Sequence, residues 1–296
     1  MKLKETESAK KKCVLLFLMF FLCYIGFEIK PMAAIVMIAV AAVEGIHFIG
    51  KLLKKQIVWK KSVLACCLSA VLGIGAAAGG VSAVVDSLHF PVVTDTVLGW
   101  QHHMMLGLNK DTNGGYSQAD FDYSTSFSSA EEQHAAELKE IGKRLKDFGV
   151  GGYLQHFVKK SARNYFDGCF GWGGLGETFY TEIFPERGTV LCSLIRSLYY
   201  DNTEDTLHRY QALFRQILWY MVLVLVPFSV FTKRPLDKKR QVAVLSVLGL
   251  MLYLQIFEAH ARYLYTFVPI FVFLATEGID NLREYLNQKS ERRVKK

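Results

Sequence analysis

Residues 31–50 read PMAAIVMIAVAAVEGIHFIG, an apolar run in which Glu44 is the only charged side chain. A helix needs about 20 mostly apolar residues to cross the hydrocarbon layer of a membrane. This run has that length, so it predicts a transmembrane helix. The question for the rest of the chain is whether its other apolar residues are gathered in the same way.

Five further apolar blocks follow this pattern, and the charged residues lie between them. The blocks are Cys13–Phe27, Ser62–Val85, Ile217–Thr232, Val242–Phe257 and Tyr263–Ala275. The shorter blocks need flanking residues or tilt to span the membrane. The first one resembles a signal peptide, but no small-x-small cleavage site follows it and it leads directly into the second block. We therefore predict an all-α integral membrane protein with about six transmembrane helices.

The basic residues predict the orientation of these helices. The formal net charge is +8, and 21 of the 35 lysines and arginines fall into four segments. These segments lie before the first block, between the second and third, between the fourth and fifth, and after the last. With six spans all four lie on one face, which the positive-inside rule makes cytoplasmic. We expect a cell-membrane protein with both termini in the cytoplasm.

The long segment 86–213 is expected to be extracytoplasmic, and it carries 17 acidic and 11 basic residues. Ser128 and Ser129, followed by Glu131 and Glu132, predict the start of a helix with a capping box. Glycines from Gly149 onward are expected to end that helix, and a second helix is expected near Tyr153–Phe166. Glu140 and Arg144 are expected to pair on the exposed face of the first helix. The predicted domains are a three-span bundle (1–85), a helical cap (86–213) and a second three-span bundle with a basic tail (214–296).

Polar and small residues inside the spans have simple structural interpretations. Gly75 and Gly79 form a G-x-x-x-G pair, which favours close packing within the protein's own bundle over a dimer interface. Glu44 and His47 share one helix face and are expected to satisfy each other, with no metal site and no cofactor. Segment 86–213 contains two cysteines, Cys169 and Cys192, and the sequence does not decide whether they form a disulfide.

Three segments together carry a resemblance to a known family. They are GFEIKPMAAIVMIA (26–39), GWQHHMMLGLNKDTNGGYSQADFDYSTSF (99–127) with IGKRL (141–145) and GGY (151–153), and EAHARYLYTFVP (258–269). In this order they resemble the C-terminal half of bacterial GT-C type membrane glycosyltransferases of the protein-mannosyltransferase-like kind. The resemblance covers most of the chain.

The resemblance implies transfer of a sugar from a polyprenyl-phosphate carrier to a cell-envelope acceptor on the outer face. The implied partners are the lipid-linked donor and membrane lipid, and no nucleic acid. Such a reaction needs a cation for the lipid phosphate and a general base for the acceptor hydroxyl. It also needs a cap that excludes water.

The resemblance implies a set of substrate-binding residues, and no catalytic residue. Lys30, directly before Pro31, is a candidate contact for the lipid phosphate, or else an ordinary snorkelling lysine. Arg262, beside Glu258 and His260, is a candidate for the phosphate or the sugar, or else part of a local ion pair. His102 and His103 are expected to line the site from residues 99–117, a segment that descends onto the membrane with Trp100 and the methionines at the interface.

The family's catalytic carboxylate lies in an external loop before the matched region, and Glu28 resembles no catalytic motif. The chain is therefore expected to be a truncated or split glycosyltransferase, with a second polypeptide supplying the missing half, or an inactive remnant. The alternative function is a non-catalytic membrane assembly partner. A transporter fits less well, because the polar groups cluster at the outer surface and no inverted repeat is present.

Overall fold

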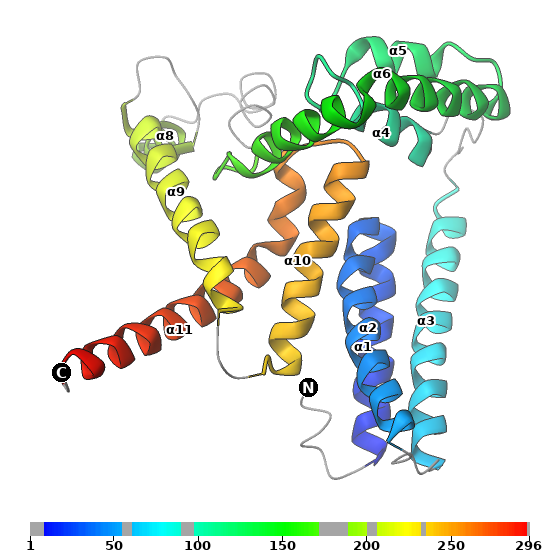
Figure 1. The fold of residues 1–296 in the computed structure, drawn as a ribbon. Coiled ribbons are helices and arrows are strands. Elements are labelled where there is room, and N and C mark those ends of the chain that lie inside the picture. Colours follow the sequence, from blue (N-terminus) through cyan, green and yellow to red (C-terminus); the bar gives the residue numbers. More distant parts are fainter. Residues whose placement is uncertain are drawn as a thin grey trace. The chain divides into compact units, whose positions relative to one another are not determined.

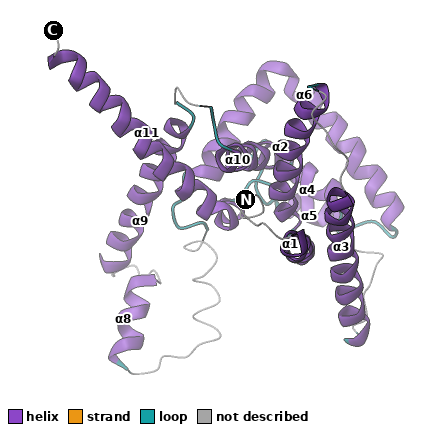
Figure 2. Ribbon diagram, turned by 90° about the horizontal axis from the view of Figure 1, so that it is seen from below, coloured by secondary structure: helices purple, strands orange, loops and turns teal. Residues whose placement is uncertain are grey.

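The structure is a computed structural model, and it describes residues 9–54, 61–89, 98–171, 189–199, 206–231 and 235–294. Within these ranges the regular elements are helices, as Figure 2 shows, and no strand occurs. The chain divides into two compact units. Unit 1 comprises residues 1–93 and 235–250, and unit 2 comprises residues 94–234 and 251–296.

Six described helices are long and apolar enough to cross a membrane, and they correspond to the six predicted blocks. They cover Lys10–Ile29, Pro31–Leu53, Leu64–Ser87, Leu207–Ser229, Lys238–Ile256 and Ala261–Glu291. The predicted all-α fold with six spans is therefore confirmed. The predicted end of the fourth span at Thr232 lies outside the described residues, and the division into three domains stays a prediction.

Unit 1 is built on a helical hairpin and a third helix that packs against it (Figure 1). Its elements are α1 (Ala9–Ile29), the short 3-10 helix η2 (Pro31–Ala33), α2 (Ala34–Leu53), α3 (Lys61–Ser87) and the first part of α10 (Lys238–Ile256). The hairpin turns at Lys30, whose backbone is extended (φ −152°, ψ 109°). Pro31 begins the next helical turn there, where its missing N–H costs no hydrogen bond.

The close packing in unit 1 uses a different glycine from the predicted pair. A Cβ on Gly73 would clash with the carbonyl oxygen of Phe17, so α3 approaches α1 closely at this point. Gly75 and Gly79 have open space where a Cβ would be, among the described residues. Among the described residues of unit 1, the predicted close packing of Gly75 and Gly79 is therefore not found.

The two polar residues of α2 bind α10 and not each other. The Lys238 ammonium lies 2.5 Å from a Glu44 carboxylate oxygen, and His47 Nε2 lies 3.0 Å from Gln241 Oε1. The prediction that Glu44 and His47 satisfy each other is wrong, because α10 supplies a partner for each. Neighbouring spans commonly satisfy intramembrane polar groups in this way.

Unit 2 contains the cap helices, which are α4 (Trp100–Gly107), α5 (Gln118–Thr125) and α6 (Ala130–Tyr165). The Ser129 hydroxyl accepts the backbone N–H of Glu132 and caps the start of α6, as predicted. Gly149 has a non-helical backbone (φ 56°, ψ −176°) and divides α6 into the two predicted helical halves. Met105 is fully buried beside Leu108 and Ile141, so it anchors the cap's own core and not the membrane interface.

The rest of unit 2 consists of spans and their connections. These elements are α8 (Val190–Tyr199), α9 (Thr206–Leu225), η4 (Val226–Ser229), the end of α10, η5 (Ala261–Phe267) and α11 (Val268–Val294). α9 meets α11 near its C-terminal end (Figure 1), where Asn281 Nδ2 donates to the carbonyls of Phe228 and Ser229 at 2.9 and 3.1 Å. These two bonds satisfy carbonyl groups freed where α9 tightens into η4.

Candidate functional site

The two segments of unit 2 that carry the resemblance meet in space. The backbone N–H of Ala259 donates to the carbonyl of Gly114 over 2.7 Å, although the residues are far apart in sequence. Arg163 of α6 donates from Nε to the Ala259 carbonyl at 3.4 Å. The connection between α10 and η5 is therefore fixed against the loop after α4, and α6 covers both.

A buried lysine of α6 joins the C-terminal ends of α4 and α10. Lys160 is 0 % exposed, and its ammonium donates to the carbonyls of Gly107 (2.8 Å) and Gln255 (2.9 Å). Burial lowers the pKa of Lys160 to about 7, and the charge of Glu258 opposes that shift only in part. His156, one turn earlier, donates to the same Gly107 carbonyl at 3.0 Å. Gly107 is required here, since a Cβ would lie 2.6 Å from the Ile256 carbonyl oxygen.

An ion pair holds α5 and the end of α4 against α6. Arg144 donates two hydrogen bonds to the Asp120 carboxylate, at 2.8 and 2.9 Å, and a third to the Met105 carbonyl at 2.9 Å. Asn109 Nδ2 also donates to Asp120, at 2.9 Å. Burial alone would raise the pKa of Asp120, but the bonds from Arg144 and Asn109 outweigh burial and lower it. The predicted pair with Glu140 is present at 3.0 Å, yet the Arg144 side chain is only 18 % exposed and so does not lie on a solvated face.

His102 lies in a closed polar group that we call the buried cluster, formed by His102, Ser124, Gln133 and Glu137, each at most 3 % exposed. His102 Nδ1 is 2.7 Å from the Ser124 hydroxyl and 3.9 Å from a Glu137 oxygen. Burial lowers the pKa of His102, with a further contribution from the neighbouring His103. Because Nδ1 faces both partners, the geometry is not that of a nucleophile–base–acid triad, in which they would occupy opposite ring nitrogens.

His103 and Glu258 form a second pair, in which the imidazole is exposed and the carboxylate is buried. The His103 side chain is 46 % exposed, and its Nδ1 lies 3.8 Å from Glu258 Oε2. The Tyr263 hydroxyl donates to the same carboxylate at 2.7 Å. Burial would raise the pKa of Glu258, but the nearby His103 ring, the Tyr263 hydroxyl and the charge of Arg262 outweigh it and lower the pKa. The carboxylate is therefore ionised at neutral pH beside a ring that solvent reaches.

The other predicted site residues have distinct positions. His260 Nδ1 accepts the backbone N–H of Arg262 at 3.2 Å and so caps η5, and burial lowers the pKa of His260. The Arg262 side chain is exposed, with its guanidinium carbon 5.4 Å from the Tyr263 ring centre. Lys30 lies in unit 1, at the hairpin turn, and is half-buried. Five of the six predicted residues thus belong to unit 2, and their part in substrate binding stays a prediction.

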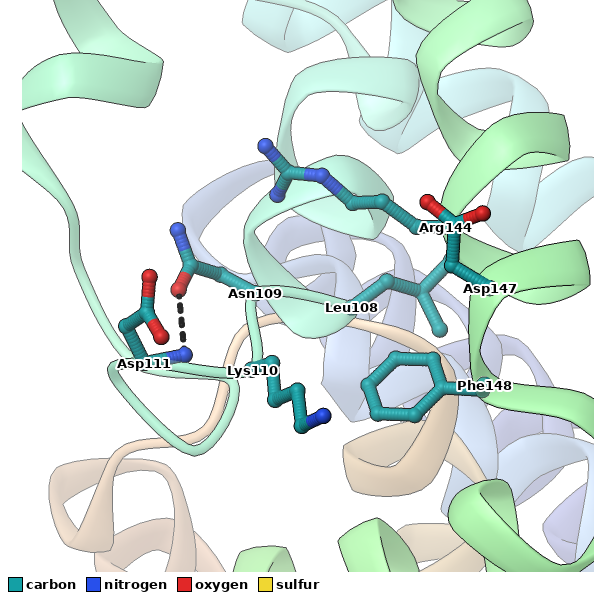
Figure 3. A pocket seen from close by; sticks show the side chains of 7 residues that line it. All are labelled: Leu108, Asn109, Lys110, Asp111, Arg144, Asp147 and Phe148. Carbon is teal, nitrogen blue, oxygen red and sulfur yellow. Dashed lines mark hydrogen bonds between the residues drawn. The ribbon is translucent and has the colours of Figure 1, made fainter.

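A pocket of about 200 Å³ opens at the loop after α4 (Figure 3). Its lining combines charged groups with the ring of Phe148 and comprises Leu108, Asn109, Lys110, Asp111, Arg144, Asp147 and Phe148. Asn109 Oδ1 accepts the backbone N–H of Asp111 at 3.0 Å and shapes the rim. This volume is below the roughly 300 Å³ at which sites for drug-sized ligands begin. The pocket therefore has room only for a small polar molecule. No group of three or more His, Cys, Asp or Glu side chains in the described part of the chain is arranged to hold a metal ion.

The model of a family described as "conserved hypothetical integral membrane protein" matches residues 1–281. The chain belongs to this family. It is therefore an integral membrane protein, as the apolar blocks indicate. No curated protein and no solved structure matches the chain.

Sequence reasoning missed the residues that fix the site in place, namely Asp120, Glu137 and Lys160. Asp120 and Arg144 are 24 positions apart, so no helical spacing links them. A signal for Lys160 was present, since His156, Lys160 and Asn164 recur at intervals of four and so share one side of a helix.

Proposed function

We propose that this protein is a membrane glycosyltransferase, or the carrier- and acceptor-binding part of one. It would transfer a sugar from a polyprenyl-phosphate carrier to a cell-envelope acceptor. The observation that carries the proposal is the meeting of residues 99–117 with residues 258–263, two segments on which the resemblance rests. Their junction combines an exposed imidazole, a buried ionised carboxylate and an exposed guanidinium.

In this proposal His103 acts as the general base, and Glu258 is the carboxylate that orients it. Glu258 faces Nδ1 of His103, which leaves Nε2 for the hydroxyl of an acceptor. A proton accepted at Nε2 would be stabilised by the Glu258 charge across the ring. Tyr263 in turn holds Glu258 in position.

Cations at the start of spans suit the phosphate of the carrier. Arg262 is exposed at the beginning of the last span, and its fork of N–H donors matches phosphate oxygens. Lys30, at the turn of the first hairpin, offers a second cation in unit 1. The buried cluster and Lys160 are almost fully buried, and their role in this proposal is to position α4 and the Glu258 connection.

Donor turnover by the purified protein, with polyprenyl-phosphate-linked sugars in mixed micelles, tests the proposal. His103→Ala and Glu258→Gln are each expected to lower turnover, about 10²-fold for the loss of a general base. Arg262→Ala and Lys30→Ala are expected to raise the KM for the donor. Lys139→Ala, an exposed cap lysine on α6, is the control and should leave both values unchanged.

If the folded wild-type chain turns over no donor, the enzymatic proposal for this chain fails. Donor binding that persists without turnover would then favour the non-catalytic assembly role.

A further inference from the structure

The second half of α6 carries three parallel rows of side chains, each with a spacing of four residues. One row faces the interior of unit 2 and is entirely polar. It consists of His156 (4 % exposed), Lys160 (0 %) and Asn164 (0 %). Lys160 and His156 have backbone partners there, as described above.

A second row faces outward and is entirely apolar. Val150 is 83 % exposed, Leu154 is 62 % exposed and Val158 is 66 % exposed. A helix on the surface of a water-soluble domain has the opposite arrangement, with its apolar stripe toward the core. This half of α6 therefore presents to its surroundings the side that would normally be buried.

A third row, Gln155, Lys159 and Arg163, is also exposed and lies beside the apolar one. Two of its three residues are cationic. A helix that lies in a membrane interface combines these features, because its apolar side enters the acyl chains and its basic side meets anionic head groups.

The contacts of α6 with the spans of unit 2 set its level. Trp219 Nε1 of α9 donates to the Tyr165 carbonyl at 2.9 Å, and Gln216 of α9 donates to the Phe166 carbonyl. Gln216 directly precedes Ile217, where the apolar block of α9 begins. The Tyr165 ring lies 6.3 Å from that of Phe271 in α11. The C-terminal end of α6 is therefore held against the apolar parts of two spans.

We propose that residues 150–166 form an interfacial membrane helix, with Val150, Leu154, Phe157 and Val158 inserted among lipid acyl chains. The occupant of the exposed apolar face is the bilayer that surrounds the spans. Lys159 lies at the level of the lipid phosphates, whereas Arg163 is held by the Ala259 carbonyl. The buried row, including Lys160, then faces a protein interior at the depth of the head groups. This inference does not depend on the proposed glycosyl transfer.

Collision of spin labels with oxygen and with a nickel chelate tests this arrangement. Leu154→Cys and Val158→Cys report on the apolar row, and Gln155→Cys and Lys159→Cys are the matched controls on the adjacent row. Each is made in the full chain with its six native cysteines replaced, and is reconstituted in phosphatidylcholine–phosphatidylglycerol vesicles. Labels at 154 and 158 should collide more with oxygen than with nickel, and the ratio should reverse at 155 and 159.

Two results would overturn the inference. Free collision with nickel at 154 and 158 would mean that water covers the face. Protection of both positions from oxygen as well as nickel would mean that protein covers it, either a second copy or the remainder of this chain. If a cysteine variant fails to fold, a photoactivatable phospholipid added to the wild-type protein gives an independent readout, because crosslinks must then map to residues 150–158.

Discussion

The ion pair between Asp120 and Arg144 is expected to be a main determinant of cap stability. Replacing Asp120 by Asn keeps the volume of the side chain but leaves the guanidinium without its bidentate partner. Removing one partner of a buried pair costs about 3–5 kcal/mol. Arg144 keeps Glu140 and the Met105 carbonyl and is 18 % exposed, so we expect the lower end of that range, about 3 kcal/mol.

Thermal unfolding in detergent micelles, followed by tryptophan fluorescence, measures this cost. A change of 1 kcal/mol shifts the midpoint of a domain of this size by roughly 2–4 °C, so Asp120→Asn should lower it by about 6–12 °C. Lys143→Ala is the control, because the Lys143 side chain is 66 % exposed and its pair with Glu140 contributes about 0–1 kcal/mol. Equal shifts for the two variants would refute the reasoning.

Acid titration gives a second readout of the same pair. Since the pKa of Asp120 lies below its value of 3.8 in the unfolded chain, the unfolded state binds a proton first as the pH falls. The stabilisation by Asp120 is complete above the unfolded-state pKa of 3.8, and it is lost as the pH falls through the lower native pKa. The Asp120→Asn variant should lack this part of the pH dependence of the unfolding midpoint. An unchanged pH dependence would exclude Asp120 as its source.

Further predictions concern α6. Since burial lowers the pKa of Lys160 from 10.5 to about 7, the unfolded chain binds the extra proton between these values, and stability should rise with pH in that window. Lys160→Met should flatten this rise in a pH series of unfolding midpoints, and a rise that persists would contradict the assignment. Gly149→Ala should cost about 1–3 kcal/mol in the same assay, because its backbone region is almost restricted to glycine. Gly142→Ala, in an open helical position, should stabilise by about 0.5–1 kcal/mol, and destabilisation there would contradict the open packing.

The spans could be predicted from the sequence because a membrane helix satisfies its backbone internally and needs only a run of apolar residues. The start of α6 and its break at Gly149 were also predictable, because Ser129 and the glycines act on their own neighbours. The partners of Glu44 and His47 were not, since α10 lies nearly 200 positions later in the chain.

The site was predictable only in part, for a related reason. The resemblance indicated His103 and Glu258, but not that they would lie 3.8 Å apart. His102 could not be distinguished from His103, although one is buried and the other exposed, because burial is decided by α5 and α6. Side-chain polarity alone did not indicate burial in the second half of α6, because the structure exposes the apolar Leu154 and Val158 and buries Lys160.

Orientation in the membrane is the claim on which the proposed function depends, and thiol labelling in intact cells tests it most directly. In a chain without its native cysteines, Lys139→Cys places a thiol on the exposed surface of the cap, and Lys54→Cys places one at the exposed end of α2. A membrane-impermeant maleimide should label position 139 in intact cells and position 54 only after permeabilisation. Labelling of position 54 in intact cells, with position 139 protected until the membrane is opened, would contradict the account.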